Sequence, residues 1–122
     1  MTGATPYGLI CGAGAALLIA AAIYPPVPAS ARVLCIDGHP APRPADVTYG
    51  GLPPRPGAER DHCGPLGLGG DDEASNIWYQ PWPEARRKDE VERQMIEAYC
   101  RGEMSLDAAR ARFIGHCRPG EW

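Results

Sequence analysis

Residues 59–81 read ERDHCGPLGLGGDDEASNIWYQP, and this stretch decides the fold of the chain. Asp61 and His62 lie in a short run that can form a strand, and the Gly-Gly pair at 69–70 marks a turn. Residues 76–80 combine an Asn with the β-branched and aromatic side chains typical of a second short strand. The order strand, turn, strand predicts a β-hairpin.

Helical patterns follow the hairpin. Residues 84–101 are highly charged and contain no Gly or Pro, and their apolar residues recur at helical spacing up to Gly102, a typical helix stop. Ser105 is a helix N-cap residue, and it begins a second, shorter helix that Gly115 ends. The apolar side of the first helix comprises Val91, Met95, Ala98 and Tyr99, and that of the second comprises Leu106, Ala109, Phe113 and Ile114.

The segment before the hairpin has a different character. Residues 32–36 can form a short strand, and residues 40–57 are rich in Pro and Gly, which favours turns and extended chain over helix. The sequence therefore predicts one small α+β domain. Residues 32–58 lead into it, and residues 59–122 form its core of hairpin, long helix and short helix.

The N-terminus indicates export. Residues 9–23 carry no charge and are mostly apolar, and Ala29-Ser30-Ala31 matches a small-x-small cleavage pattern. We expect residues 1–31 to be a signal peptide cleaved after Ala31, which leaves a secreted or periplasmic protein without stable membrane contact. Because residues 1–8 contain no Lys or Arg, an uncleaved membrane anchor is the alternative.

The charge balance limits the ways in which the chain can bind nucleic acid. The 122 residues carry a net charge of −3, which argues against a broad electrostatic nucleic-acid surface. A local basic run remains at Arg86, Arg87 and Lys88.

Four of the five cysteines lie outside the expected signal peptide. An even number in a small exported chain favours two disulfides among Cys35, Cys63, Cys100 and Cys117, and the count alone allows three connectivities. A zinc site has little support, because no CxxC pair occurs.

The hairpin motif resembles that of the HNH, or ββα-metal, endonucleases. The matching residues are Asp61-His62, Pro65-Leu66, Leu68-Gly69-Gly70 and Asn76-Ile77-Trp78. The later RKDEVE and CRGEMSLDAAR segments are similar to a small bacterial and phage subgroup, so the resemblance covers about residues 33–114. It implies an α+β fold in which a ββα-metal hairpin packs on a helix. It also implies hydrolysis of phosphodiester bonds in DNA, or alternatively RNA.

The resemblance assigns chemical roles to specific residues. His62 would take the proton of the attacking water, since the ordinary pKa of a His lies near neutrality and a neutral imidazole can accept a proton. Asp61 and Asn76 would bind one divalent metal through hard oxygen ligands, which suit Mg²⁺, with Mn²⁺ or Zn²⁺ as alternatives. The basic run Arg86, Arg87 and Lys88 would hold substrate phosphate.

The subgroup also has a Cys at the positions of Cys35 and Cys100, which implies that these two pair and leaves Cys63 to pair with Cys117. The chain departs from the family at the last His, which would fall among residues 85–88. Three explanations remain open: the metal has two protein ligands, Asp89 or Glu92 substitutes, or activity is lost.

Two other classes of function are open. The chain can be a degenerate HNH scaffold that binds a partner or nucleic acid without cutting it. It can also be an unrelated interaction protein held together by disulfides. The sequence leaves the oligomeric state undetermined.

Overall fold

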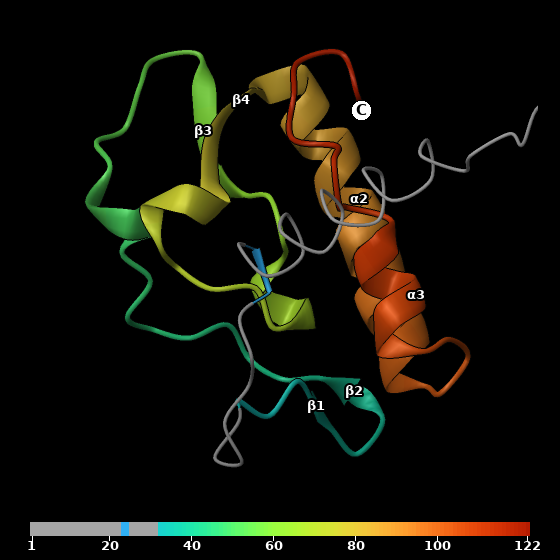
Figure 1. Ribbon diagram of the computed structural model, residues 1–122. Helices are drawn as coiled ribbons and strands as arrows, with labels where there is room; N and C mark the ends of the chain where they lie inside the picture. The colour runs from blue at the N-terminus through green and yellow to red at the C-terminus, as the bar shows by residue number, and fades with distance from the viewer. Residues whose placement is uncertain (1–22, 25–31) are drawn as a thin grey trace, which may run out of the picture.

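The computed structural model describes residues 23–24 and 32–122 and confirms the α+β fold class (Figure 1). Two antiparallel hairpins, β1–β2 and β3–β4, accompany the helices α2 and α3. The elements are β1 (Cys35–Ile36), β2 (His39–Pro40), η1 (Tyr49–Gly51), β3 (Ala58–His62), η2 (Leu66–Leu68), η3 (Ala74–Asn76), β4 (Ile77–Pro81), α2 (Trp82–Cys100) and α3 (Leu106–Ala111).

The β3–β4 hairpin is the predicted one. Its register places Asp61 opposite Trp78 and His62 opposite Ile77. Cys63 N donates to Asn76 O at 2.8 Å, which extends the pairing into the loop. That loop contains the turns η2 and η3 instead of one tight turn.

Helix α2 begins directly after β4, two residues earlier than the sequence pattern predicts. Pro83 lies in its first turn, where a missing N–H costs nothing because the first helical N–H groups have no partner within the helix. Ser105 caps α3 as predicted, with its Oγ accepting from Ala108 N at 3.0 Å. This helix ends at Ala111, before the predicted Gly115.

The core forms where the two helices meet the hairpin loop. Leu68, Ala109 and Phe113 are fully buried there, and the predicted apolar stripe of α2 packs against them through Val91, Met95 and Tyr99 together with Ile96. Ile23 and Tyr24 also join this cluster, and the guanidinium of Arg110 lies over the ring of Tyr24. A chain cleaved after Ala31 would lack these two side chains.

Both predicted disulfides are confirmed. Cys35–Cys100 joins the β1–β2 hairpin to the end of α2, and Cys63–Cys117 joins the end of β3 to the segment after α3. Two disulfides fit a protein that works outside the reducing cytosol.

The β1–β2 hairpin was not predicted, because only a single strand was expected before the Pro-rich segment. Asp37 and Gly38 both have positive φ at its two-residue turn, which an Asp-Gly pair accommodates well. The hairpin lies at the foot of α2, where β2 contacts that helix (Figure 1). The residues after β2 then run back toward β3 and form one side of the cavity described below.

The expected signal peptide lies outside the described residues, apart from Ile23 and Tyr24. Within the described part of the chain, neither α2 nor any other helix combines the length and apolar character that a membrane crossing needs.

Candidate active site

The candidate site is built on the two faces of β3. Asp61 and His62 are consecutive, so their side chains leave the strand on opposite sides. Asp61 contacts α2, whereas His62 contacts the segment around η1 and the hairpin loop. Among the described strands, β3 pairs only with β4. Both residues nevertheless belong to the lining of one cavity of about 220 Å³, to which β3 contributes Glu59, Arg60, Asp61 and His62.

His62 forms a dyad with Asp72. Its Nε2 lies 2.8 Å from Oδ1 of Asp72, and the His62 side chain is only 6% exposed. A carboxylate only accepts hydrogen bonds, so the proton of the neutral ring lies on Nε2 and the lone pair on Nδ1. In the described part of the chain, no group hydrogen-bonds Nδ1. The dyad thus leaves His62 with a free basic nitrogen.

The carboxylate of Asp72 is held in place by hydrogen bonds from a segment distant in the sequence. It accepts from Thr48 N, from Thr48 Oγ1 at 2.7 Å and from Tyr49 N at 2.9 Å. Partial burial raises the pKa of Asp72, but these bonds and the one from His62 together lower it to about 2. Asp72 is therefore ionised at neutral pH.

A glycine makes the hydrogen bonds from Thr48 and Tyr49 to Asp72 sterically possible. The backbone at Gly50 approaches η3 so closely that a Cβ there would lie 2.3 Å from Ala74 N, and its φ of +62° favours Gly as well. This approach brings Thr48 and Tyr49 within reach of Asp72. The Tyr49 ring also packs beside His62, with centroids 5.3 Å apart.

Burial sets the charge state of the His62 ring. Desolvation lowers the pKa of His62 below its ordinary value, and the bond to Asp72 opposes this only in part. His62 is consequently neutral at pH 7, which is the state that a general base requires.

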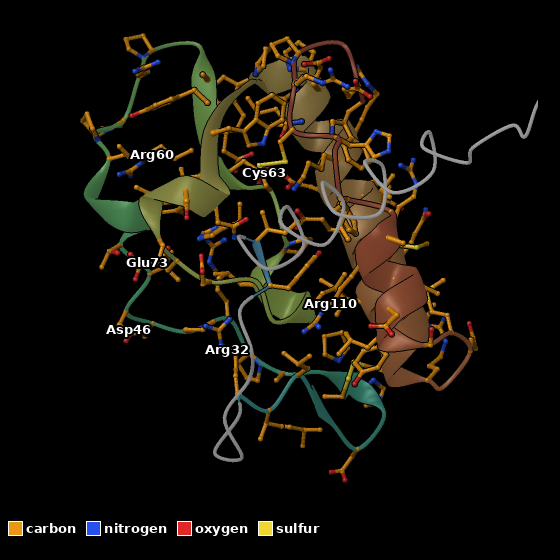
Figure 2. The ribbon with its side chains drawn as sticks, in the orientation of Figure 1. Arg32, Asp46, Arg60, Cys63, Glu73 and Arg110 are labelled. Carbon is orange, nitrogen blue, oxygen red and sulfur yellow. A yellow bond between two sulfur atoms is a disulfide. The ribbon has the colours of Figure 1, made fainter. Side chains whose placement is uncertain are left out.

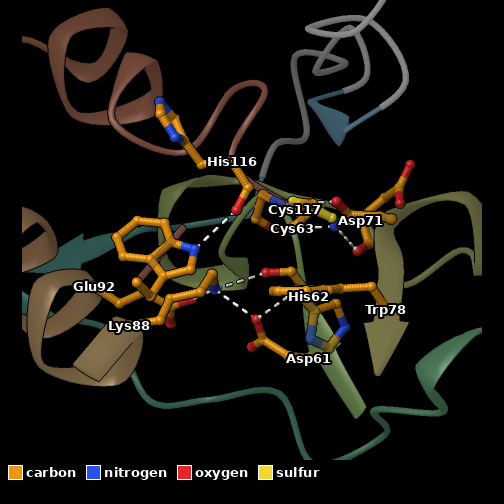
Figure 3. Close-up of a disulfide and its surroundings, with 12 residues drawn as sticks. Asp61, His62, Cys63, Asp71, Trp78, Lys88, Glu92, His116 and Cys117 are labelled. Carbon is orange, nitrogen blue, oxygen red and sulfur yellow. Dashed lines mark hydrogen bonds and ion pairs between the residues drawn. A yellow bond between two sulfur atoms is a disulfide. The ribbon is translucent and has the colours of Figure 1, made fainter. Parts of the chain in front are cut away.

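On the other face of β3, Asp61 is paired with Lys88 of α2 (Figure 3). The Lys88 side chain is 0% exposed, and its Nζ lies 2.7 Å from Asp61 Oδ2, donates to His62 O at 3.0 Å and bonds Glu92. Burial opposes the charge of Lys88, but Glu92 and Asp61 raise its pKa above the ordinary value. Lys88 is thus a buried cation that fixes the strand to the helix, and it does not lie on the surface where the phosphate role would place it.

Asp61 keeps one oxygen free of these contacts. Its Oδ2 accepts from Lys88 and from Trp78 Nε1 at 3.1 Å, whereas Oδ1 has no hydrogen-bond partner among the described residues. Oδ1 is therefore the Asp61 oxygen that is free to bind a metal ion.

Two further carboxylates lie beside Asp61. Glu59, Asp61 and Asp89 each offer an oxygen atom within 4.8 Å of the others. Burial raises the pKa of both Glu59 and Asp89, and the charge of Asp61 raises both further. Oε2 of Glu59 is buried without a hydrogen-bond partner. This acidic cluster concentrates negative charge on the cavity wall.

Asn76 lies elsewhere and closes the hairpin loop. Its Oδ1 accepts from Gly64 N at 2.8 Å, and its Nδ2 donates to Gly64 O and Asp71 O at 3.0 and 2.8 Å. The side chain is 0% exposed. These bonds hold the loop that follows His62, so both polar atoms of Asn76 are committed to backbone groups.

The remaining predicted phosphate residues lie on the exposed side of α2. Arg86 and Arg87 are exposed, and Arg87 donates to Trp122 O at 2.6 Å. Neither lines the cavity. The arginines that do line it are Arg32, Arg43 and Arg60 (Figure 2 labels Arg32 and Arg60).

Sequence reasoning missed Asp72 and Glu59 and named Asp89 only as one substitute for the absent His. Asp72 sits in an acidic turn, and nothing local links it to His62. Glu59 carries a readable signal, since it stands two residues before Asp61 on the same face of the strand.

Comparison with family models, with curated proteins and with solved structures gives no match for this chain.

Proposed function

We propose that this chain is an exported, metal-dependent endonuclease of the HNH type that hydrolyses phosphodiester bonds of DNA, with RNA as the alternative substrate. The observation that carries the proposal is the shared cavity. A neutral His62, oriented by Asp72, lines the same cavity as Glu59, Asp61 and Asp89.

His62 acts as the general base. Its free Nδ1 accepts a proton from the attacking water, and Asp72 holds the ring and stabilises the imidazolium that forms. Because three donors besides His62 keep the Asp72 carboxylate in place, the imidazole is fixed before substrate arrives. Positioning of this kind removes part of the entropic cost of reaction.

The residues present fit a hard divalent cation. Three carboxylates converge, one oxygen of Glu59 is buried without a partner, and oxygen donors are the ligands that Mg²⁺ and Mn²⁺ prefer. We assign Glu59, Asp61 and Asp89 as the residues that would hold the metal, with Asp89 in place of the absent His and Asn76 assigned to loop closure. Such a metal would supply charge stabilisation for the phosphate and its leaving oxygen.

Lys88 favours the alternative function, a degenerate HNH scaffold that binds a partner or nucleic acid without cutting it. Its ammonium lies against Asp61, so a fixed cation already neutralises part of the acidic cluster. An inactive protein would keep this ion pair and bind no divalent metal.

The decisive experiment combines cleavage with metal binding. Circular single-stranded DNA and supercoiled plasmid are incubated with Mg²⁺, Mn²⁺ or Zn²⁺, or with EDTA, and Mn²⁺ binding is measured separately by calorimetry. We expect metal-dependent cleavage that His62→Ala reduces about 10²–10⁴-fold. Mn²⁺ binding should persist in His62→Ala and weaken in Asp89→Asn. Absence of both cleavage and metal binding would support the scaffold reading.

A further inference from the structure

The described cavity restricts how a substrate can reach the reacting groups. His62 and Asp61 are both buried, so a phosphodiester must enter the cavity to meet them. Four segments line this space: residues 32–34, residues 40–44, η2 and α2, in addition to β3 itself. Its volume of about 220 Å³ lies below the roughly 300–1,000 Å³ typical of sites for drug-sized ligands. The cavity therefore has room for a short piece of a chain and not for a duplex.

A rigid duplex cannot easily bring a phosphodiester into this cavity. Duplex DNA is stiff over about 150 base pairs, and bending or unpairing it carries a cost that depends on the deformation. A single strand rotates freely about its backbone bonds and can insert one phosphate without that cost. The lining residues of the 40–44 segment include three prolines, which stiffen that side of the cavity.

Two arginines of the cavity lining, Arg43 and Arg60, are placed to bind an anion. Arg43 donates to Tyr49 Oη at 2.7 Å, and Arg60 donates to Leu52 O at 2.8 Å, while both guanidinium groups lie over the Tyr49 ring. Among the described residues neither forms an ion pair with a carboxylate. By contrast, Arg93 on the outer face of α2 is paired with Glu90 and Glu97. Arg43 and Arg60 thus keep their charge available for an anion.

We propose that the cavity accepts single-stranded nucleic acid and that Arg43 and Arg60, rather than the basic run of α2, hold the substrate phosphate. This inference rests on the proposed nuclease function and extends it to substrate class. With two arginines in contact, binding should depend only weakly on salt. The expected slope of log K against log salt is about −0.7, since the two arginines hold one phosphate and each neutralised phosphate contributes about −0.7 for a single strand.

The test uses one labelled DNA strand of about 30 nucleotides, alone or annealed to its complement, with the full-length protein and Mn²⁺. We expect the single strand to be cleaved at least about tenfold faster than the duplex. The catalytically impaired His62→Ala protein should show the same preference in binding, measured by fluorescence anisotropy. Equal or faster cleavage of the duplex, or equal binding, would overturn the inference.

Variants locate the phosphate contact. Arg43→Gln should raise KM for the single strand about tenfold with little change in kcat. Arg118→Gln removes an equal charge from an exposed site outside the cavity lining and is the matched control, which should leave both constants unchanged. A larger loss in Arg86→Gln than in Arg43→Gln would transfer the phosphate contact to α2 and refute the assignment. Circular dichroism verifies that each variant is folded.

The two levels of proposal fail in different ways. Loss of all cleavage with every metal contradicts the nuclease function, and the binding preference of the His62→Ala protein still decides the substrate class. Cleavage without strand preference contradicts only the present inference.

Discussion

Lys88→Met tests the buried ion pair that joins β3 to α2. Methionine keeps most of the length of the side chain but leaves Asp61 and Glu92 without their shared cation and His62 O without its donor. Removing one partner of a buried pair costs about 3–5 kcal/mol, because the other charge remains buried and uncompensated. A domain of this size has a free energy of unfolding of roughly 5–15 kcal/mol, so the loss would be a large fraction of the total.

The size of the loss should depend on pH. Lys88 has a pKa above its ordinary 10.5, so its charge and its stabilising contribution are fully present between pH 5 and 8. Burial raises the pKa of Glu92, and in the variant no ammonium opposes that effect. The folded variant therefore takes up a proton more readily than the unfolded chain. Its deficit relative to the parent protein should shrink as the pH falls from 8 to 5.

Urea unfolding followed by tryptophan fluorescence at pH 5 and pH 8 measures both effects. Arg93→Met is the matched control, because its ion pairs on α2 are exposed and are worth at most about 1 kcal/mol. If Lys88→Met loses no more than Arg93→Met, or loses the same amount at both pH values, the reasoning about the buried pair is refuted.

Three further predictions concern the loop, the disulfides and the dyad. Asn76→Ala should cost roughly 1–3 kcal/mol in urea unfolding for each loop group left unpaired, yet leave Mn²⁺ affinity unchanged in calorimetry; weaker metal binding in the folded variant would return this residue to the metal site. Replacing both Cys35 and Cys100 by Ser should remove about 4 kcal/mol of stability by the chain-entropy relation, which thermal melting under non-reducing conditions checks; an unchanged Tm would contradict it. Asp72→Asn should lower the cleavage rate about 10–100-fold, as loss of an orienting partner does. The ionised Asp72 stabilises the parent protein, and this contribution is lost as the pH falls from about 4 to about 2, so the variant should lack it at every pH. A variant with the parent's acid unfolding curve would count against the low pKa of Asp72.

The parts of the fold that the sequence predicts are those with strong local signals. The hairpin, the long helix and the capped short helix follow from residue pattern and turn chemistry within each segment. The two disulfides formed as the resemblance implied. The β1–β2 hairpin was missed, although Asp37-Gly38 is a turn signal, because strands of two residues are too short to show an alternating pattern.

The candidate site was harder to predict because it depends on contacts between distant segments. Asp72 meets Thr48 across 24 positions, and no local pattern reports that encounter. Lys88 belongs to a basic run that is typical of a solvated helix face. Its burial follows from the packing of α2 on β3, and the only local hint is Glu92 one turn further along the helix.

The two disulfides have a topological consequence. They interlace, since Cys63 lies inside the ring closed by Cys35–Cys100 and Cys117 lies outside it. Every peptide bond between Cys35 and Cys117 is therefore enclosed by at least one covalent ring. A protease that cuts the chain once anywhere in this stretch, including the Pro-rich segment, releases no fragment until a reductant is added. The nicked protein should run as an intact species on a non-reducing gel and separate into two pieces only after reduction.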